Sequence, residues 1–224
     1  MTKTPGINRL KSDRGRAPRD YYRTPRGLVV SALEYFIRSE NFWRNFNIMN
    51  GINRVRALDP GCGDGVWARQ AYYTLTSPSP YFRRPHIHAL DLEPQTDSSE
   101  EFTAYRQNFL EWEFVGKQYN LIMGNPPYSL AEEFIRKSLE LIEERGYVYF
   151  LLPLNFLGSR RRELGLFREH PLKEVVVLSR RPSFFSVDGK PNSTDTMNYA
   201  MFLWQKGYTG TTVMNWLYWG YLEV

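Results

Sequence analysis

Apolar residues recur along the chain in two patterns, one typical of helices and one typical of buried strands. Between Pro25 and Arg38 they return every three to four positions, and Thr24-Pro25 suits a helix N-cap followed by proline at the first helical position. The segments 66–75 and 130–145 also have helical spacing, and Gly146 suits the position that ends the second of these helices. Short, almost wholly apolar runs, typical of strands buried on both faces, lie at 55–58, 87–92, 121–123, 147–152, 175–178 and 199–204.

Strands that alternate with helices predict a doubly wound α/β sheet, mostly parallel, with helices on both faces. In such a sheet, ligands bind beyond the C-terminal ends of the strands. The chain of 224 residues suits one ordinary domain, which we expect at 21–224.

The first 20 residues differ from the rest in charge and in apolar content. The whole chain has 29 Lys and Arg against 24 Asp and Glu, a net charge of +5, and 1–20 holds six basic and two acidic residues, or four of those five charges. With hardly any apolar residues, this segment cannot bury enough surface to offset its ordering entropy. We expect a flexible basic arm, which either grips phosphates or is simply solvated.

Composition excludes two classes of protein. A single cysteine excludes a disulfide framework, and no apolar run approaches the ~18 residues of a membrane span. The start of the chain is basic and polar, unlike a secretory signal. We therefore expect a cytoplasmic protein with no membrane partner.

A glycine-rich turn follows the first predicted strand. The sequence Asp-Pro-Gly-Cys-Gly-Asp-Gly at 59–65 places glycines at alternate positions, where they permit a tight turn and close approach to a ligand. Asp91 ends the second strand, where a carboxylate can accept hydrogen bonds from a ribose diol. A turn without a ligand is the alternative. His86 and His88 have no third ligand at metal-binding spacing, so we expect no metal site.

The strongest chemical signal is Asn125-Pro126-Pro127-Tyr128, which directly follows the strand at 121–123. The prolines fix the turn, and the oxygen of Asn125 and the carbonyl of Pro126 offer two acceptors for the two hydrogens of an exocyclic amino group. Tyr128 offers a face on which a planar ring can stack.

With these motifs together, the sequence resembles the S-adenosylmethionine-dependent amino-methyltransferases of nucleic acids, which act on adenine N6 or cytosine N4. The resemblance covers about 21–206 and has the gamma order, with the Thr-Pro helix before the glycine turn and the Asn-Pro-Pro-Tyr motif last. It implies a Rossmann-like class I methyltransferase fold with an antiparallel strand near the C-terminus. It also implies direct methyl transfer from S-adenosylmethionine to adenine N6 of a flipped-out base in DNA, in a prokaryotic or viral cytoplasm.

The resemblance assigns a role to each matching position. Asn125, Pro126, Pro127 and Tyr128 correspond to the catalytic motif. Tyr128 with Phe184 or Phe185 encloses the extruded base, and no metal is implied. Cofactor binding is implied for Thr24, Pro25, Asp59, Gly61, Cys62, Gly63, Asp91, Leu92, Asn108 and Phe109.

Two departures from the family bear on cofactor and target. Asn108 stands where the family usually has aspartate, and its oxygen can still contact an adenine amino group. Only 18 residues follow Lys206, whereas many gamma enzymes have a large C-terminal recognition domain. Target choice would then depend on a separate specificity subunit, a homodimer or basic side chains. The candidates for phosphate contact, each of which also suits a solvated surface, are Arg160, Arg161, Arg162, Arg180 and Arg181.

Several alternatives remain open at this point. Cytosine N4 can replace adenine N6, and RNA can replace DNA as the substrate. A protein glutamine methyltransferase of the release-factor type or an rRNA guanine-N2 methyltransferase presents a similar amide or amino group to Asn125. A catalytically silent nucleic-acid-binding subunit would keep only the fold.

Overall fold

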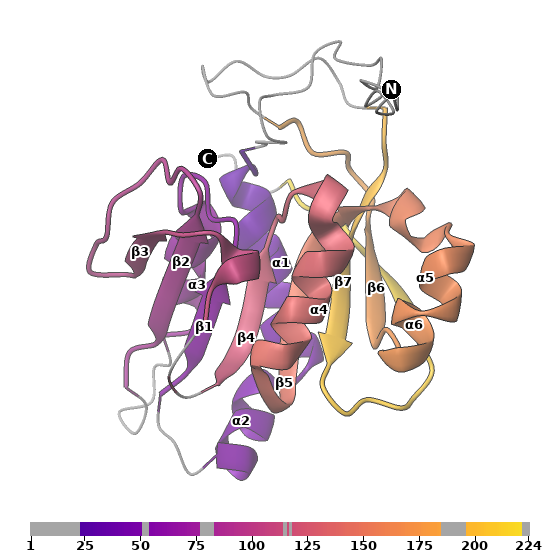
Figure 1. Ribbon diagram of the computed structural model, residues 1–224, viewed down its shortest axis with the longest axis horizontal. Coiled ribbons are helices and arrows are strands. Elements are labelled where there is room, and N and C mark those ends of the chain that lie inside the picture. The colour runs from indigo at the N-terminus through magenta and orange to yellow at the C-terminus, as the bar shows by residue number, and fades with distance from the viewer. Residues whose placement is uncertain are drawn as a thin grey trace, which may run out of the picture.

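The structure is a computed structural model that describes residues 23–50, 54–76, 83–113, 116, 118–184 and 196–220. The described strands form one sheet in the order β3-β2-β1-β4-β5-β7-β6-β8. All neighbouring strands are parallel except at β7, which runs antiparallel to both β5 and β6. Figure 1 shows this reversal, with the arrowhead of β7 pointing down. The predicted mostly parallel sheet with an antiparallel strand near the C-terminus is confirmed.

The strands are β1 (Arg56–Asp59), β2 (His86–Asp91), β3 (Thr103–Arg106), β4 (Tyr119–Gly124), β5 (Ile142–Pro153), β6 (Glu174–Leu178), β7 (Tyr199–Gln205) and β8 (Val213–Leu217). The α-helices are α1 (Arg26–Ser39), α2 (Phe42–Asn50), α3 (Val66–Thr74), α4 (Ala131–Leu141), α5 (Arg160–Leu164) and α6 (Leu166–Glu169). The 3₁₀ turns are η2 (Phe109–Glu111), η3 (Tyr128–Leu130) and η4 (Leu154–Leu157).

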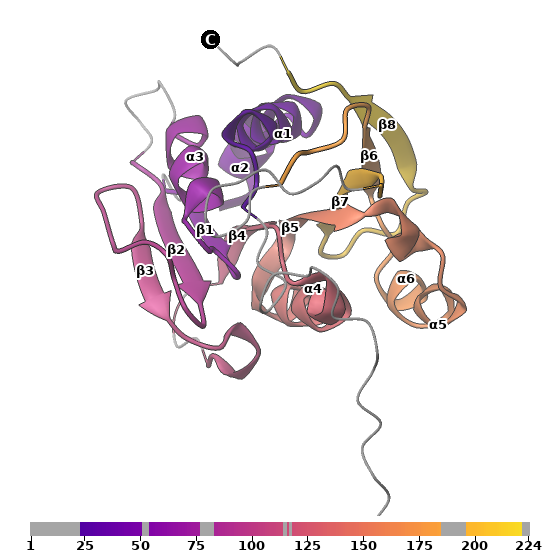
Figure 2. The ribbon, with the colours of Figure 1, turned by 90° about the horizontal axis from the view of Figure 1, so that it is seen from above.

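Helices cover both faces of the sheet, as predicted. Figure 2 shows α1, α2 and α3 on one side and α4, α5 and α6 on the other. Successive residues of β5 belong alternately to the two apolar cores, since Tyr149 and Leu151 pack on the α1 side and Val148 and Phe150 on the α4 side. All four are fully buried, and each contributes about 1.5–3 kcal/mol through burial of its side chain. None of the helices in the described ranges is long and apolar enough to cross a membrane.

Most predicted elements are present within one or two residues, but the expected end of α4 is wrong. The helix ends at Leu141 and β5 begins at once at Ile142, so Gly146 lies in a strand and not after a helix. Arg145 has the left-handed backbone there, with φ 65°. Gly146 is needed for space, because a Cβ would lie 2.6 Å from Cγ1 of Ile142.

The predicted cap of α1 also needs correction. The helix begins at Arg26, with Pro25 at the N-cap position and no side-chain hydrogen bond to the cap. The carbonyl of Pro25 accepts from the amides of Leu28 and Val29. The hydroxyl of Thr24 does not cap the helix, because it is used in the cavity described below.

Two histidines of β2 form a partly buried cluster on the α4 side of the sheet. Nδ1 of His88 lies 2.6 Å from the hydroxyl of Tyr119, and Nε2 of His88 lies 3.2 Å from Nε2 of His86. Within the described residues, no group of three or more His, Cys, Asp and Glu side chains is placed to hold a metal ion. Desolvation, and the neighbouring ring of His86, lower the pKa of His88 from 6.5 to about 4.

The depressed pKa of His88 predicts a loss of stability in acid. The unfolded chain takes up this proton near pH 6.5 and the folded chain only near pH 4, so the free energy of unfolding should fall as the pH drops through this window. Replacing His88 with glutamine should make the free energy of unfolding depend less on pH in this window. Urea unfolding at pH 7.5, 6, 5 and 4 measures both proteins, and parallel profiles for wild type and variant would contradict the assignment.

Candidate active site

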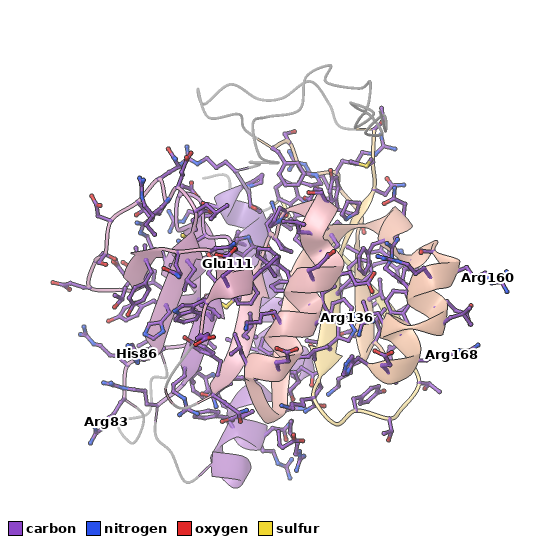
Figure 3. All side chains as sticks on the ribbon, in the orientation of Figure 1. Arg83, His86, Glu111, Arg136, Arg160 and Arg168 are labelled. Atoms are coloured by element: carbon purple, nitrogen blue, oxygen red, sulfur yellow. The ribbon has the colours of Figure 1, made fainter. Side chains whose placement is uncertain are left out.

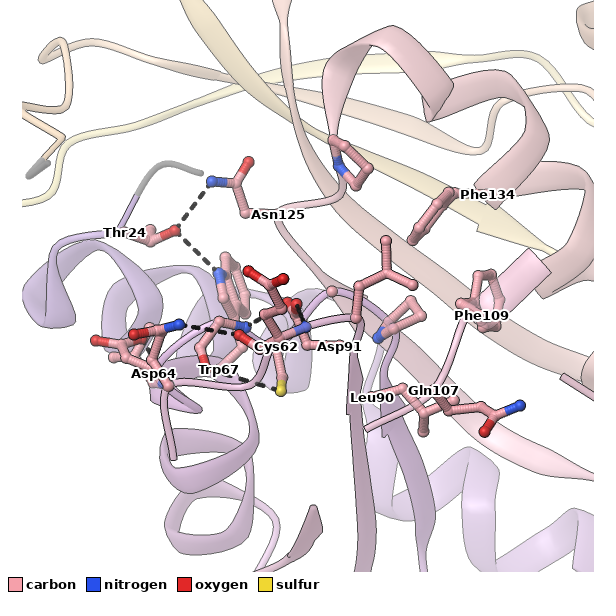
Figure 4. Close-up of a pocket in the computed structure, with 18 of the residues that line it drawn as sticks. Thr24, Cys62, Asp64, Trp67, Leu90, Asp91, Gln107, Phe109, Asn125 and Phe134 are labelled. Atoms are coloured by element: carbon pink, nitrogen blue, oxygen red, sulfur yellow. Dashed lines mark hydrogen bonds between the residues drawn. The ribbon is translucent and has the colours of Figure 1, made fainter. Parts of the chain in front are cut away.

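A cavity of about 420 Å³ opens at the C-terminal ends of β1, β2 and β4. Such a volume lies in the range of small-molecule sites. It is lined by the glycine turn after β1, the acid at the end of β2, the η2 turn and the segment after β4. The glycine turn and the segment after β4, about 65 residues apart, meet here because β1 pairs with β4. The cavity is shown in Figure 4.

The glycine turn is held by backbone hydrogen bonds and by two left-handed residues. Gly63 has φ 51° and Gly65 has φ 74°, conformations that glycine adopts without steric penalty. A Cβ on Gly65 would also lie 2.7 Å from the ring of Phe102. The amide of Cys62 donates to the carbonyl of Leu90 at 2.9 Å, which ties the turn to the end of β2. Cys62 is buried in this turn, where burial raises the pKa of its thiol well above the usual range.

Asp91, expected to bind a ribose diol, lies on the cavity wall and also braces the glycine turn. Its Oδ2 accepts from the amide of Gly63 at 3.0 Å, and its Oδ1 accepts from the amide of Glu93 at 2.9 Å. A carboxylate has about four lone-pair sites, so each oxygen retains the capacity to accept one more hydrogen bond. The carboxylate can therefore hold the turn and bind a diol at the same time.

The far end of the cavity is an apolar slot with the amide of Asn108 near its edge. Phe109 and Phe134 pack with their ring centroids 4.9 Å apart, beside Leu90. Leu92 lines the same cavity and is largely exposed. Asn108 also lines it, but its Oδ1 accepts the amide of Leu110 at 3.1 Å and so caps η2.

The expectation for Asn108 therefore changes in one respect. Its oxygen was expected to contact an adenine amino group, whereas in the structure the same oxygen satisfies the backbone of η2. The short side chain makes this local bond because an Asx-type cap competes with any more distant partner. Contact with a ligand then requires the second lone pair of this oxygen or the amide nitrogen.

Asp59 is not on the cavity wall, contrary to its predicted place among the cofactor residues. It is completely buried at the end of β1, and neither carboxylate oxygen has a hydrogen-bond partner of ordinary geometry among the described residues. Desolvation, and the charge of Asp91, raise the pKa of Asp59 well above its usual range, although the amide of Ala68 lowers it in part. Gly124 makes room for this side chain, because a Cβ there would lie 2.6 Å from Oδ1 of Asp59.

Asn125 and Thr24 meet at the mouth of the cavity. The amide nitrogen of Asn125 donates to Oγ1 of Thr24 at 3.2 Å, and Nε1 of Trp67 donates to the same oxygen at 3.3 Å. Figure 4 shows both bonds, with the oxygen of Asn125 on the side away from Thr24. Arg23, just before Thr24, forms an ion pair with Asp64 of the glycine turn at 2.5 Å. These contacts join three parts of the chain around one opening.

Trp67 is a site residue that the sequence analysis missed. It is almost fully buried at the second position of α3, and it lines the cavity. A tryptophan in a helix that follows a glycine turn carries no local signal that its indole nitrogen reaches a threonine 43 residues earlier. Gln107, which also lines the cavity, was missed for the same reason.

The aromatic residues expected around a base have separate roles in the structure. Tyr128 is partly buried, and its ring centroid lies 5.9 Å from that of Tyr199. Phe184 is only 2% exposed and meets Tyr199 edge to face at 5.0 Å. Phe184 therefore supports Tyr199 from within the core and does not present its ring as an open wall. Phe185 lies outside the described residues.

The arginines expected to contact phosphate divide into two groups. On α5, Arg161 pairs with Glu132 at 2.7 Å, and Arg162 donates to the carbonyl of Phe156 with its guanidinium over the ring of that residue. Intramolecular contacts therefore already engage these two side chains. Arg160 is exposed and extends outward at the edge of the molecule (Figure 3). Arg180 and Arg181 follow β6, at the same edge of the sheet as the cavity.

Comparison with known proteins gives two partial sequence matches. No protein-family model matches the chain. The chain is 29% identical over 136 residues to a type II methyltransferase of Thermus thermophilus, covering 46% of this chain and 30% of that protein. It is 24% identical over 123 residues to a Mycoplasma pneumoniae protein named as an uncharacterized adenine-specific methylase, covering 49% of this chain and 29% of that protein. The chain thus spans less than a third of the length of these relatives.

Solved structures show the same fold. A Listeria monocytogenes protein named as a putative class I S-adenosylmethionine-dependent methyltransferase superimposes with a TM-score of 0.59 at 12% identity, over 90% of this chain and 67% of that one. An Agrobacterium tumefaciens protein named as a predicted O-methyltransferase gives a TM-score of 0.50 at 11% identity, over 86% of this chain and 85% of that one. The chain has the class I methyltransferase fold, and its relatives support a methyltransferase that uses S-adenosylmethionine.

The double acceptor role of Thr24 predicts a sharp difference between two small substitutions. Thr24→Val keeps the shape but leaves the N–H groups of Trp67 and Asn125 without their acceptor, which should lower stability by about 1–3 kcal/mol. Thr24→Ser keeps the oxygen and should stay close to wild type. Urea unfolding of the two variants measures the difference, and equal stability would show that the hydroxyl is not the acceptor that holds these groups.

Proposed function

We propose that this protein transfers a methyl group from S-adenosylmethionine to the exocyclic N6 amino group of adenine in DNA. The observation that carries the proposal is the position of Asn125, at the mouth of a nucleoside-sized cavity and directly after β4. The relatives named as a type II methyltransferase and an adenine-specific methylase support this target. Such an enzyme works in a cytoplasm where DNA is accessible.

The donor set around the cavity suits S-adenosylmethionine. Asp91 retains acceptor capacity for a ribose diol, and the apolar slot near Phe109 and Phe134 suits a purine ring. The left-handed Gly63 and Gly65 let the backbone turn closely beneath the opening. When bound, the cofactor supplies a methyl group on a sulfonium centre, which makes it an electrophile.

Asn125 supplies the chemistry for the acceptor amine. The lone pair of an exocyclic amine is delocalised into its ring, so the amine is a weak nucleophile. Acceptors at Oδ1 of Asn125 and at the carbonyl of Pro126 can bind its two hydrogens and stabilise the positive charge that develops on nitrogen. Because Nδ2 of Asn125 already donates to Thr24, the amide presents its oxygen to the amine. Direct transfer in this geometry involves no covalent enzyme intermediate.

Tyr128 forms one wall for the extruded base. Its ring is braced by Tyr199, which is in turn braced by Phe184, so its orientation is fixed before a base arrives. Taking a base out of a duplex costs a few kcal/mol, and stacking on an aromatic side chain returns about 1–3 kcal/mol. A preformed ring therefore offsets part of the cost of base flipping.

Replacing Asn125 tests the proposal directly. The purified protein should form N6-methyladenine on unmethylated genomic DNA with S-adenosylmethionine, and Asn125→Ala should lower kcat about 10²–10³-fold through loss of one acceptor. The readout is mass spectrometry of the digested nucleosides. Asn45→Ala, which removes an amide that donates to the carbonyl of Glu40 away from the cavity, serves as the matched control.

Other products would change or overturn the proposal. N4-methylcytosine would keep the mechanism and change the base. Product only on RNA or on the glutamine of a release factor would overturn the DNA substrate. Cofactor binding without any methylated product would favour a silent nucleic-acid-binding subunit.

The two roles of Asp91 predict a specific pattern of cofactor affinity. Asp91→Ala removes both the acceptor for the ribose and the brace on the amide of Gly63, so the affinity for S-adenosylhomocysteine should fall about 10–100-fold. Glu93→Ala, which removes a neighbouring acid on the cavity wall while leaving its backbone amide to Asp91, is the matched control. Isothermal titration calorimetry compares the three proteins, and equal loss in both variants would argue against a specific contact at Asp91.

A further inference from the structure

A second surface lies at the same edge of the sheet as the cavity, around the ends of β6 and β8. Both strands run parallel to each other and point in the same direction as β4 and β5, so the residues that follow them lie at the edge where Asn125 lies. The surface consists of Arg180, Arg181, Trp216 and Tyr218, here called the β6–β8 surface.

The cations of the β6–β8 surface are held in place without carboxylates. The guanidinium of Arg180 stacks over the ring of Trp219, 5.0 Å from its centroid, and Nε1 of Trp219 donates to the carbonyl of Arg180 at 2.8 Å. Gly220 leaves space for this arrangement, since a Cβ there would lie 2.9 Å from a guanidinium nitrogen of Arg180. Arg181 donates from Nε to Oδ1 of Asn198 at 3.1 Å. Among the described residues, neither arginine forms an ion pair.

Three arginines of α4, α5 and α6 show the opposite arrangement. Arg161 pairs with Glu132 at 2.7 Å and Arg168 with Glu163 at 3.1 Å. Arg136 on α4 pairs with Glu132 as well, and with Glu169 at 2.6 Å. Each of these cations is balanced inside the protein. Arg180 and Arg181 differ from these three arginines, because their charge is not balanced by a carboxylate among the described residues, and such charge attracts a polyanion.

Exposed aromatic rings lie on the neighbouring β8 segment, and a Cβ on Gly220 would lie 3.3 Å from the ring of Tyr218 as well as 2.9 Å from Arg180. Trp216 is 63% exposed and Tyr218 is 55% exposed, although both belong to the β8 segment that closes the sheet. Two other aromatic residues near the C-terminus, Trp204 and Trp219, have a core role. Trp216 does not, because it alternates with Leu217 and projects from the opposite face of an edge strand. Large exposed rings near arginines that form no ion pair among the described residues suit contact with bases and sugars.

Distance along the sheet fits a nucleic acid that also reaches the cavity. From β4 to β6 there are three strand spacings and from β4 to β8 there are four, or about 14 and 19 Å at about 4.8 Å each. Along the axis of a DNA duplex each nucleotide of one strand advances by about 3.4 Å, so this interval corresponds to about four to six nucleotides. The chain of ring contacts from Tyr128 through Tyr199 to Phe184 connects the cavity mouth to the start of the surface.

We propose that the β6–β8 surface binds the sugar-phosphate backbone of DNA on one side of the target base, with Arg180 and Arg181 on phosphates and Trp216 against the adjoining sugars or bases. This inference rests on the proposed function, because it takes the DNA that holds the target adenine as the ligand. It also assigns target contact to this surface and not to the arginines of α5.

The test compares two pairs of arginines in binding to a fluorescein-labelled 24-base-pair DNA duplex. The double variant Arg180→Gln/Arg181→Gln removes the charges on the β6–β8 surface, and Arg161→Gln/Arg168→Gln removes two carboxylate-paired charges as the matched control. Fluorescence anisotropy over a series of salt concentrations should show a salt slope smaller by about 2 for the first pair and unchanged for the second. Trp216→Ala should weaken binding about fivefold or more.

Methylation by the same proteins separates this inference from the proposed function. If DNA is the substrate, Arg180→Gln/Arg181→Gln should raise KM for the duplex about tenfold with kcat and S-adenosylhomocysteine affinity unchanged, because a remote backbone contact is made equally in ground and transition states. If the wild type methylates DNA and this variant has the same salt slope and the same KM, the proposed role of the β6–β8 surface is wrong and the proposed function stands. Wild type that methylates no DNA would overturn the proposed function, whatever the binding slopes show.

Two further outcomes would also overturn the surface. Equal loss of binding in both arginine pairs would show general charge and not a defined contact. A change in oligomeric state of Trp216→Ala by light scattering, with DNA binding intact, would show that this face joins two copies of the chain.

Discussion

Parallel pairing of β1 with both β2 and β4 is the constraint on which the site depends. The strand order reverses direction at β1, so the segments after β1 and β4 diverge to opposite faces and leave a crevice between them. The glycine turn leads into α3 on one face, and the segment after Gly124 leads through η3 into α4 on the other. Asp91 enters from β2 and braces the turn. Strand register therefore places the glycine turn, Asp91 and Asn125 at one edge of the sheet.

Hydrogen-bond direction then gives this crevice its chemical character. A hydroxyl oxygen accepts two hydrogen bonds, and Oγ1 of Thr24 receives the N–H groups of Trp67 and Asn125. With both acceptor sites in use, the amide oxygen of Asn125 is directed away from Thr24. The polarity at the cavity mouth thus depends on a residue that precedes α1, about 100 positions from the one it orients.

Local patterns in the sequence predicted the parts of the fold that are locally determined. The apolar run at 147–152 and the helical spacing at 66–75 hold in the structure, since burial on both faces and a single apolar stripe leave clear periodicities. The edge strand β3 was missed because Thr103–Arg106 is mixed in polarity and largely exposed. The end of α4 was misjudged because glycine, which often follows the end of a helix, is needed here to leave space for the side chain of Ile142. The partners of Arg161, Asn108 and Trp67 are tertiary or local choices that spacing does not specify.

Asp59 and Gly124, at the ends of the adjacent strands β1 and β4, both depart from favourable local structure. Asp59 is a fully buried acid without a well-formed hydrogen bond, and Gly124 has φ 151° at the end of a buried strand. Each departure lowers stability by itself, but the missing Cβ of Gly124 is what admits the carboxyl group of Asp59. Because β1 and β4 are adjacent, this pair lies directly beneath the turn and the Asn-Pro-Pro-Tyr segment. Residues that lower stability in this way are expected at functional sites, where the requirements of the site outweigh those of stability. Asp59 thus belongs to the support of the site, although it does not line the cavity.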